Sequence, residues 1–140
     1  MNTAPDTATD TAPGSDLLRG SLRADAWGTA VFGVVMLAGG GWLSGPLGLP
    51  AGWFTPIGIA MLGGAAALGL IAGYPRIPPR PAALAVAGNG VSGAAMLLLV
   101  ATGALPLTGL GVAFVLVGAA WVTGFAALQL TGLRRSRAQA

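Results

Sequence analysis

Few side chains in this sequence can take part in catalysis or ligand binding. Four polar residues fall inside long apolar runs or at their ends: Asp25, Thr29, Asn89 and Gln129. A carboxylate, a hydroxyl and two amides can form one hydrogen-bonded group, and the acid can also hold a cation or exchange a proton. We therefore treat these four residues, called the polar cluster below, as the candidate site.

The composition excludes most other chemistries. All seven basic residues are Arg and all four acidic residues are Asp, and the chain has no Cys or His. It therefore has no thiolate nucleophile and lacks the commonest metal ligand and general base. General acid–base catalysis needs a titratable group in a cleft, and only Asp25 lies near an apolar run. We expect a protein that is not an enzyme, with no metal and no cofactor.

The chain is too apolar for an ordinary soluble domain. It has 140 residues, of which 54% are hydrophobic and 8% charged, whereas soluble domains carry roughly 25% charged residues. Only Arg76 and Arg80 interrupt the segment from residue 26 to residue 133. The charge-free stretches on either side, 26–75 and 81–133, are each suited to two membrane spans of about 20 residues plus a turn.

Segments rich in proline and glycine lie where the turns of such a protein should fall. They are "SGPLGLPAG" at 44–52, "YPRIPPRP" at 74–81 and "ALPLTG" at 104–109. Proline ends helices because its ring removes a backbone donor and clashes with the preceding turn. We predict an all-α fold, a four-helix transmembrane bundle with helices at about 25–44, 54–74, 82–103 and 109–132.

The two ends of the chain are expected to lie outside this transmembrane domain of residues 19–133. Residues 1–18 are mostly Thr, Ala, Pro and Asp, which bury too little surface to offset the entropy of ordering, so we predict a disordered tail. Residues 134–140 are predicted to form a basic tail. Its "RRSR" is read as a topology signal, with contact to anionic lipid heads as the alternative.

The arginines predict the orientation. All seven lie in the N-terminal flank, the 74–81 loop or the C-terminal tail, and the other two loops hold none. The positive-inside rule then places both termini and the central loop in the cytoplasm. Arg as the only basic residue, together with abundant Ala and Gly, suggests a GC-rich bacterial genome and hence the bacterial inner membrane. A cleaved signal peptide is the alternative for the first helix, since two arginines, an apolar run and "LAGGG" allow it.

The two halves of the chain resemble each other. At an offset of 60 residues, Gly28 and Gly33 align with Gly88 and Gly93. The pattern suggests two parallel copies of one helical hairpin, related by an axis along the membrane normal. If the first helix is part of such a repeat, it belongs to the bundle, which weakens the signal-peptide alternative.

A second glycine pattern concerns helix packing. "GLIAG" at 69–73 is a GxxxG motif formed by Gly69 and Gly73. Such motifs favour close helix crossing, either within the chain or between two copies of it.

Each polar residue also has an alternative structural role. Asp25 opens the predicted first helix, where an acid complements the helix macrodipole with Arg23 near enough to screen it. Alternatively it is a buried carboxylate paired with Asn89 or Gln129. Asn89 is expected to form an interhelical hydrogen bond, with a ligand contact as the alternative. Trp121 is expected in the core, its indole N–H bonded to a hydroxyl or a backbone carbonyl, with cofactor stacking as the alternative.

Several short motifs give the chain a resemblance to known proteins. They are Arg-x-Asp-Ala at 23–26, Asn89 early in the third helix, Thr-x-x-Gly at 108–111 and Leu-Gln at 128–129. The chain resembles a group of small bacterial four-helix integral membrane proteins that carry no assigned biochemical role. The chain departs from that pattern at Val91 and Gly118, where the group often has an aromatic residue and Gln. The resemblance implies fold and location and no activity.

The sequence therefore predicts a multi-pass membrane protein that is a non-enzymatic bundle for packing or for interaction with a partner or lipid. The alternative function is a small transporter or ligand-binding membrane protein that uses the polar cluster. The expected partners are the lipid bilayer and a second copy of the chain or another membrane protein. Nucleic acid is not expected, because no group of arginines is interleaved with stacking aromatics.

Overall fold

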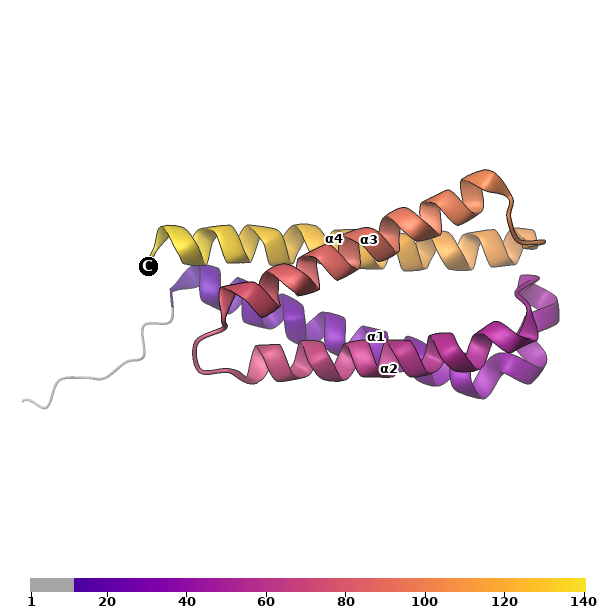
Figure 1. The fold of residues 1–140 in the computed structure, drawn as a ribbon, viewed down its shortest axis with the longest axis horizontal. Helices are drawn as coiled ribbons and strands as arrows, with labels where there is room; N and C mark the ends of the chain where they lie inside the picture. The colour runs from indigo at the N-terminus through magenta and orange to yellow at the C-terminus, as the bar shows by residue number, and fades with distance from the viewer. Residues whose placement is uncertain (1–11) are drawn as a thin grey trace, which may run out of the picture.

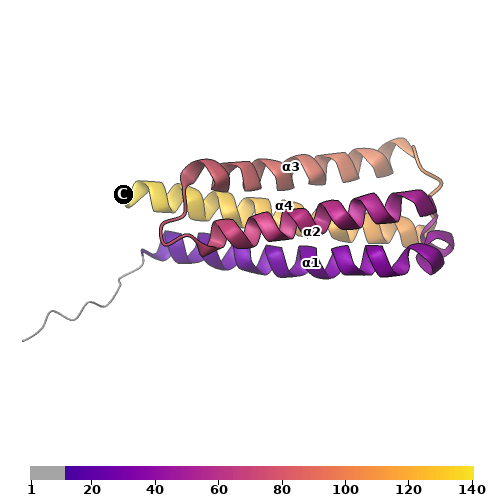
Figure 2. The same cartoon turned by 60° about the horizontal axis from the view of Figure 1, so that its bottom comes forward.

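A computed structural model describes residues 12–140, and the fold is a bundle of four α-helices (Figure 1). Their bounds are α1 Pro13–Leu47, α2 Ala51–Gly73, α3 Pro79–Thr102 and α4 Gly109–Ala138. Each of them is long and apolar enough to cross a membrane. The predicted all-α four-helix bundle is confirmed, and Figure 2 shows the four helices running side by side along its long axis.

Two predicted boundaries are wrong at the ends of the chain. The helix α1 begins at Pro13, so residues 13–18 are helical; residues 1–11 lie outside the described part, and a disordered tail there stays a prediction. The helix α4 runs on through the arginines to Ala138, so most of the predicted basic tail is helical. Leu18 and Leu22, four residues apart, explain the early start of α1, because both fall on one helix face that is buried.

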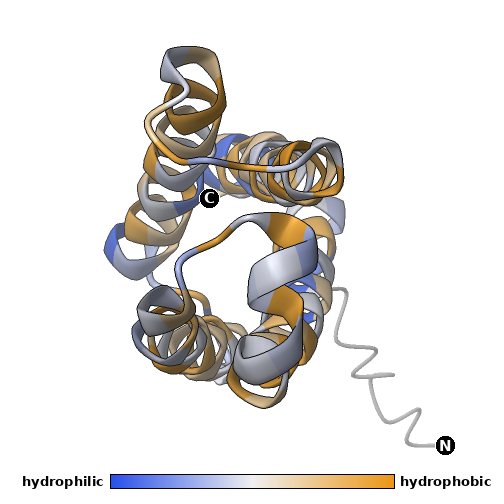
Figure 3. Cartoon of the chain, turned by 90° about the vertical axis from the view of Figure 1, so that its right-hand side faces the viewer, coloured by the Kyte–Doolittle hydropathy of each residue, from blue (hydrophilic) through white to orange (hydrophobic). Residues whose placement is uncertain are grey.

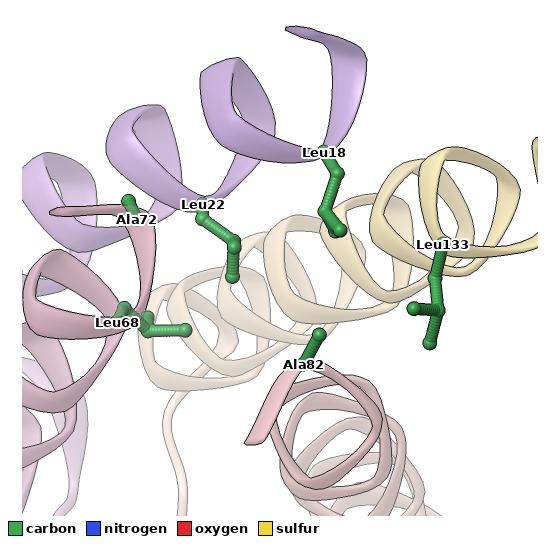
Figure 4. Close-up of a cluster of buried hydrophobic side chains, with 6 residues drawn as sticks. All are labelled: Leu18, Leu22, Leu68, Ala72, Ala82 and Leu133. Carbon is green, nitrogen blue, oxygen red and sulfur yellow. The ribbon is translucent and has the colours of Figure 1, made fainter. Parts of the chain in front are cut away.

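An apolar core joins all four helices at the end of the bundle where α1 begins and α4 ends. Figure 4 shows its buried side chains converging from the four helices. Leu18 and Leu22 come from α1 and Leu133 from α4, and all three are almost fully buried. This cluster consists of Leu18, Leu22, Leu68, Ala72, Ala82 and Leu133.

The side chain of Arg19 in α1 binds the C-terminal end of α2, next to this core. Its guanidinium donates to the backbone oxygens of Ala72, Tyr74 (2.8 Å) and Pro75 (3.0 Å). The last carbonyls of a helix have no partner within the helix and carry partial negative charge, so a cation is favourable there. Arg19 therefore satisfies backbone oxygens at and just after the C-terminal end of α2.

The opposite end of the bundle is closed by the loop before α4. The hydroxyl of Thr108 accepts a hydrogen bond from the Gly111 N–H (3.0 Å) and donates to the Pro46 oxygen (2.5 Å). A Cβ on Gly111 would lie 1.8 Å from the backbone oxygen of Leu47. The Thr-x-x-Gly motif therefore combines a helix cap with the clearance that the end of α1 needs.

The four helices are packed unequally. The helix α1 packs along α2 and α4, and α3 packs along α4, but α2 and α3 scarcely touch. Figure 1 shows α3 starting beside the end of α2 and then running away from it. Two parallel hairpin copies would make the α1–α4 and α2–α3 contacts equivalent, so the packing departs from that symmetry. Equivalent contacts survive at Gly33, which packs on α2, and Gly93, which packs on α4.

The glycines that allow close helix packing are not those of the GxxxG motif. A Cβ on Gly132 of α4 would lie 2.8 Å from the backbone nitrogen of Leu18 in α1. A Cβ on Gly69 or Gly73 would meet nothing within 4 Å. Packing of Gly69 and Gly73 against another helix of the same chain is therefore wrong, and only their packing between two copies stays a prediction.

We predict that Gly132→Ala lowers the free energy of unfolding by about 1 to 3 kcal/mol, because the added methyl pushes α4 away from α1. Gly69→Ala is the matched control and should leave stability unchanged or slightly raised. Thermal unfolding in a mild detergent, followed by circular dichroism, measures both. Equal destabilisation by the two changes would show that Gly69 packs against something outside this chain.

Candidate functional site

The carboxylate of Asp25 is the centre of the site. Asp25 lies roughly three turns into α1, its side chain is 0% exposed, and it belongs to the interior of the bundle. Because α1 begins at Pro13, Asp25 is not in the first turn, so its expected role as a capping acid is wrong. Arg23, two residues away on the helix, is exposed.

Four side chains donate hydrogen bonds to this carboxylate. Its Oδ2 accepts from the amide nitrogens of Asn89 (2.6 Å) and Gln129 (2.8 Å). Its Oδ1 accepts from the Thr29 hydroxyl (3.2 Å) and from the indole N–H of Trp121 (3.2 Å). The structure thus brings all four members of the polar cluster into one network and adds Trp121.

The donor set matches the negatively charged form of the acid. Each carboxylate oxygen has two lone pairs, and each here accepts two hydrogen bonds, so both are saturated. All four partners are neutral side chains. Hydrogen bonds to a charged acceptor are the strong kind, and they offset much of the cost of burying Asp25. Among residues 12–140, no cationic side chain is hydrogen-bonded to this carboxylate.

The network ties three helices together. The amide nitrogen of Asn89 donates a second hydrogen bond to Oε1 of Gln129, at 3.2 Å. Asp25 belongs to α1, Asn89 to α3 and Gln129 to α4, so one buried anion links all three. The helix α2 contributes nothing to it. Because α3 buries little else along its length than Ala82 and Gly93, Asn89 is its main polar anchor.

The expectation for Trp121 was right in placing it inside the bundle but wrong about its partner, which is a carboxylate. A Cβ on Gly28, three residues after Asp25, would lie 2.0 Å from Cζ2 of the Trp121 ring. Gly28 therefore clears the space through which the indole reaches Asp25. The sequence signal for this contact was Gly28, which lies about one helical turn after the buried Asp25. Trp121 also stacks at a tilt with Phe125, with ring centroids 4.8 Å apart.

A large cavity lies beside the network. Its volume is about 710 Å³, and its lining is almost wholly apolar, with side chains from all four helices. The cavity is bounded by both α2 and α3, which scarcely touch each other, and Figure 3 shows the mostly apolar colouring of the helices around the axis of the bundle. The polar side chains in its wall include Asn89, Ser92 and Thr29.

Asn89 belongs to both the network and the cavity. Its side-chain nitrogen donates to Asp25 and Gln129, so Oδ1 is the side-chain polar atom that these hydrogen bonds leave unused, in a residue that lines the cavity. Within residues 12–140 neither this oxygen nor the Ser92 hydroxyl, one turn further on, has a hydrogen-bond partner. Asn89 and Ser92 therefore bring an acceptor and a hydroxyl to the mostly apolar lining of the cavity.

Comparison with known proteins adds no information about the site. No protein-family model, no curated protein and no solved structure matches this chain. The resemblance to small bacterial four-helix membrane proteins is therefore supported only in that the chain forms a small bundle of four apolar helices. In the part of the chain that the structure describes, no three potential metal-ligating side chains come together.

We predict that Asn89→Leu lowers the free energy of unfolding by about 1 to 3 kcal/mol, because it removes the link of α3 to Asp25 and Gln129. Ser92→Ala, one turn away on the same helix, is the control and should change stability by less than about 0.5 kcal/mol. Thermal unfolding of the two variants in the same detergent gives the comparison. If both variants unfold like the unchanged protein, Asn89 does not anchor α3.

Proposed function

We propose that this protein is a non-enzymatic, multi-pass membrane protein that binds an amphiphilic small molecule taken from the bilayer. The cavity beside α2 and α3 carries this proposal. Its volume of about 710 Å³ falls in the range of small-molecule sites, which are typically about 300 to 1,000 Å³ and mostly apolar with a few polar groups.

The neighbouring helices support entry from the side. Between helices that scarcely touch, a molecule dissolved in lipid can reach the cavity without crossing a polar surface. Its chain would then lie among side chains such as Met61, Leu84 and Met96, all of which line the cavity. Met side chains adapt their shape to varied apolar ligands, so the wall suits a flexible hydrocarbon chain.

Binding without catalysis is the function that the site chemistry favours. Asp25 is the only acidic side chain at the site, and all its lone pairs already accept hydrogen bonds. General acid–base work needs a group within reach of the substrate, and this carboxylate is fully buried. Transport of the bound molecule is a second candidate, favoured by one observation: the acid lies inside the bundle and not at a helix edge.

The location is part of the same proposal and rests on the sequence. We propose the bacterial inner membrane from the composition, and a cytoplasmic side for both termini from the arginine distribution. A reporter active only in the cytoplasm, fused after Arg137, should be active. The same reporter inserted after Gly103 should be silent. The reverse pattern would overturn the orientation.

We predict that filling the cavity abolishes binding. Three probes share a dodecyl chain: radiolabelled dodecylamine, dodecanol and dodecanoate. At least one should bind saturably to the protein in phosphatidylcholine nanodiscs, above the uptake of empty nanodiscs. Gly64→Phe should lower that binding at least about tenfold, because Gly64 lines the cavity and has open space beside it.

Gly63→Phe is the matched control. Gly63 also has open space beside it but does not line the cavity, so binding should stay within about twofold of the unchanged protein. If none of the three probes binds saturably, or if the two variants lose binding equally, the cavity is not a ligand site.

A further inference from the structure

We propose that the cavity selects amphiphiles with a cationic ammonium head over neutral and anionic ones, and that it holds this head at the Asn89 carbonyl oxygen. The inference rests on the proposed function and adds the ligand class. Two observations carry it: the Asn89 side-chain amide donates through its nitrogen to Asp25 and Gln129, and the hydrogen-bond partners of the Asp25 carboxylate are all neutral side chains.

The side-chain amide of Asn89 connects Asp25 to the cavity, because it is hydrogen-bonded to the carboxylate and belongs to a residue that lines the cavity. Its nitrogen donates to the carboxylate at 2.6 Å and to Gln129 at 3.2 Å. A group that donates to an anion is polarised, so its own acceptor becomes stronger, and such chains of hydrogen bonds reinforce one another. The Asn89 oxygen is therefore a strengthened acceptor, and it suits a head that carries N–H donors.

The negative charge of Asp25, next to the Asn89 side-chain amide, favours a ligand with an ammonium head over one with a hydroxyl head. The four partners of Asp25 are neutral, and Arg19, six residues earlier on α1, is engaged by carbonyl oxygens at the end of α2. Water and lipid head groups screen little inside an apolar cavity, so an unbalanced negative charge acts over several ångströms. A cationic head at Asn89 lowers this electrostatic cost, whereas a carboxylate head raises it.

Aromatic side chains on the same wall favour the same ligand. Trp121, Phe32 and Phe114 all line the cavity. Phe32 meets Trp121 and Phe114 edge to face, with ring centroids 6.3 Å and 6.0 Å apart. The face of an aromatic ring attracts cations within about 6 Å of its centre. Three aromatic side chains and the polarised amide of Asn89 thus line the same cavity.

The three dodecyl probes test the inference directly, since they differ only in the head group. At neutral pH dodecylamine carries a positive head, dodecanol a neutral one and dodecanoate a negative one. Dodecylamine should bind to the unchanged protein at least about tenfold more tightly than dodecanol, and dodecanoate should bind weakest. Equal binding of the amine and the alcohol, or tighter binding of dodecanoate, overturns the inference while leaving the cavity as a ligand site.

Two variants test the residues. Asp25→Asn keeps the size of the side chain and removes its charge, so the ratio of dodecylamine affinity to dodecanol affinity should fall from at least about tenfold to about one. A variant that still binds dodecanol and still prefers the amine would show that Asp25 does not set selectivity.

Ser92→Lys gives a second test that does not disturb the network, because Ser92 lines the cavity one turn from Asn89 and is exposed. The added cation should reverse the order and make dodecanoate the best ligand. If dodecylamine still binds best to Ser92→Lys, the head lies elsewhere in the cavity and the inference is wrong.

Discussion

The arrangement of this bundle depends on one buried carboxylate that three helices share. Membrane helices gain little from the hydrophobic effect when they associate, since lipid tails are as apolar as their own side chains. Asp25 changes this balance, because its oxygens accept hydrogen bonds from α3 and α4 and from its own helix. A charge in an apolar interior is costly unless donors surround it. The donors can only surround Asp25 when α1, α3 and α4 are in register.

The cavity is a consequence of where this network places the helices. The polar network joins α1, α3 and α4, and Gly132 and Gly28 let α4 approach α1 closely. The helix α2 takes no part in the network and is held to α1 by apolar packing and by Arg19. Nothing comparable holds α2 to α3, so these two helices stay apart and the space beside them is the cavity. Because α3 is held on the side of α1 and α4 and not against α2, space remains for a molecule from the bilayer.

Much of the fold could be predicted from local signals, and part of the site as well. Segments rich in proline and glycine marked the turns because these residues disfavour helices, although α1 continues through Pro46 to Leu47 and α2 contains Pro56. Asp25, Asn89 and Gln129 could be grouped from the sequence because each lies near the cytoplasmic end of its predicted helix. The role of Trp121 was missed because an indole reaches across a helix interface, which a position along one helix does not reveal. The start of α1 was missed because its first turns are amphipathic, and a search for charge-free runs passes over them.

The cavity could not be predicted at all. The helices α2 and α3 are apolar on every side, so no stripe of residues shows which faces meet. Their separation depends on where the network places α3, and that is a property of the whole bundle.

The most direct test of this account is the distance between helices, measured by pulsed electron paramagnetic resonance. The chain has no cysteine of its own, so single spin labels can be placed at will. Labels at the exposed positions Val31 and Val91 report on α1 and α3, and a pair at Val31 and Ile59 reports on α1 and α2. Asp25→Ala should broaden or lengthen the α1–α3 distances and leave the α1–α2 distances unchanged. An unchanged α1–α3 distribution would contradict the claim that the carboxylate holds α3 in place.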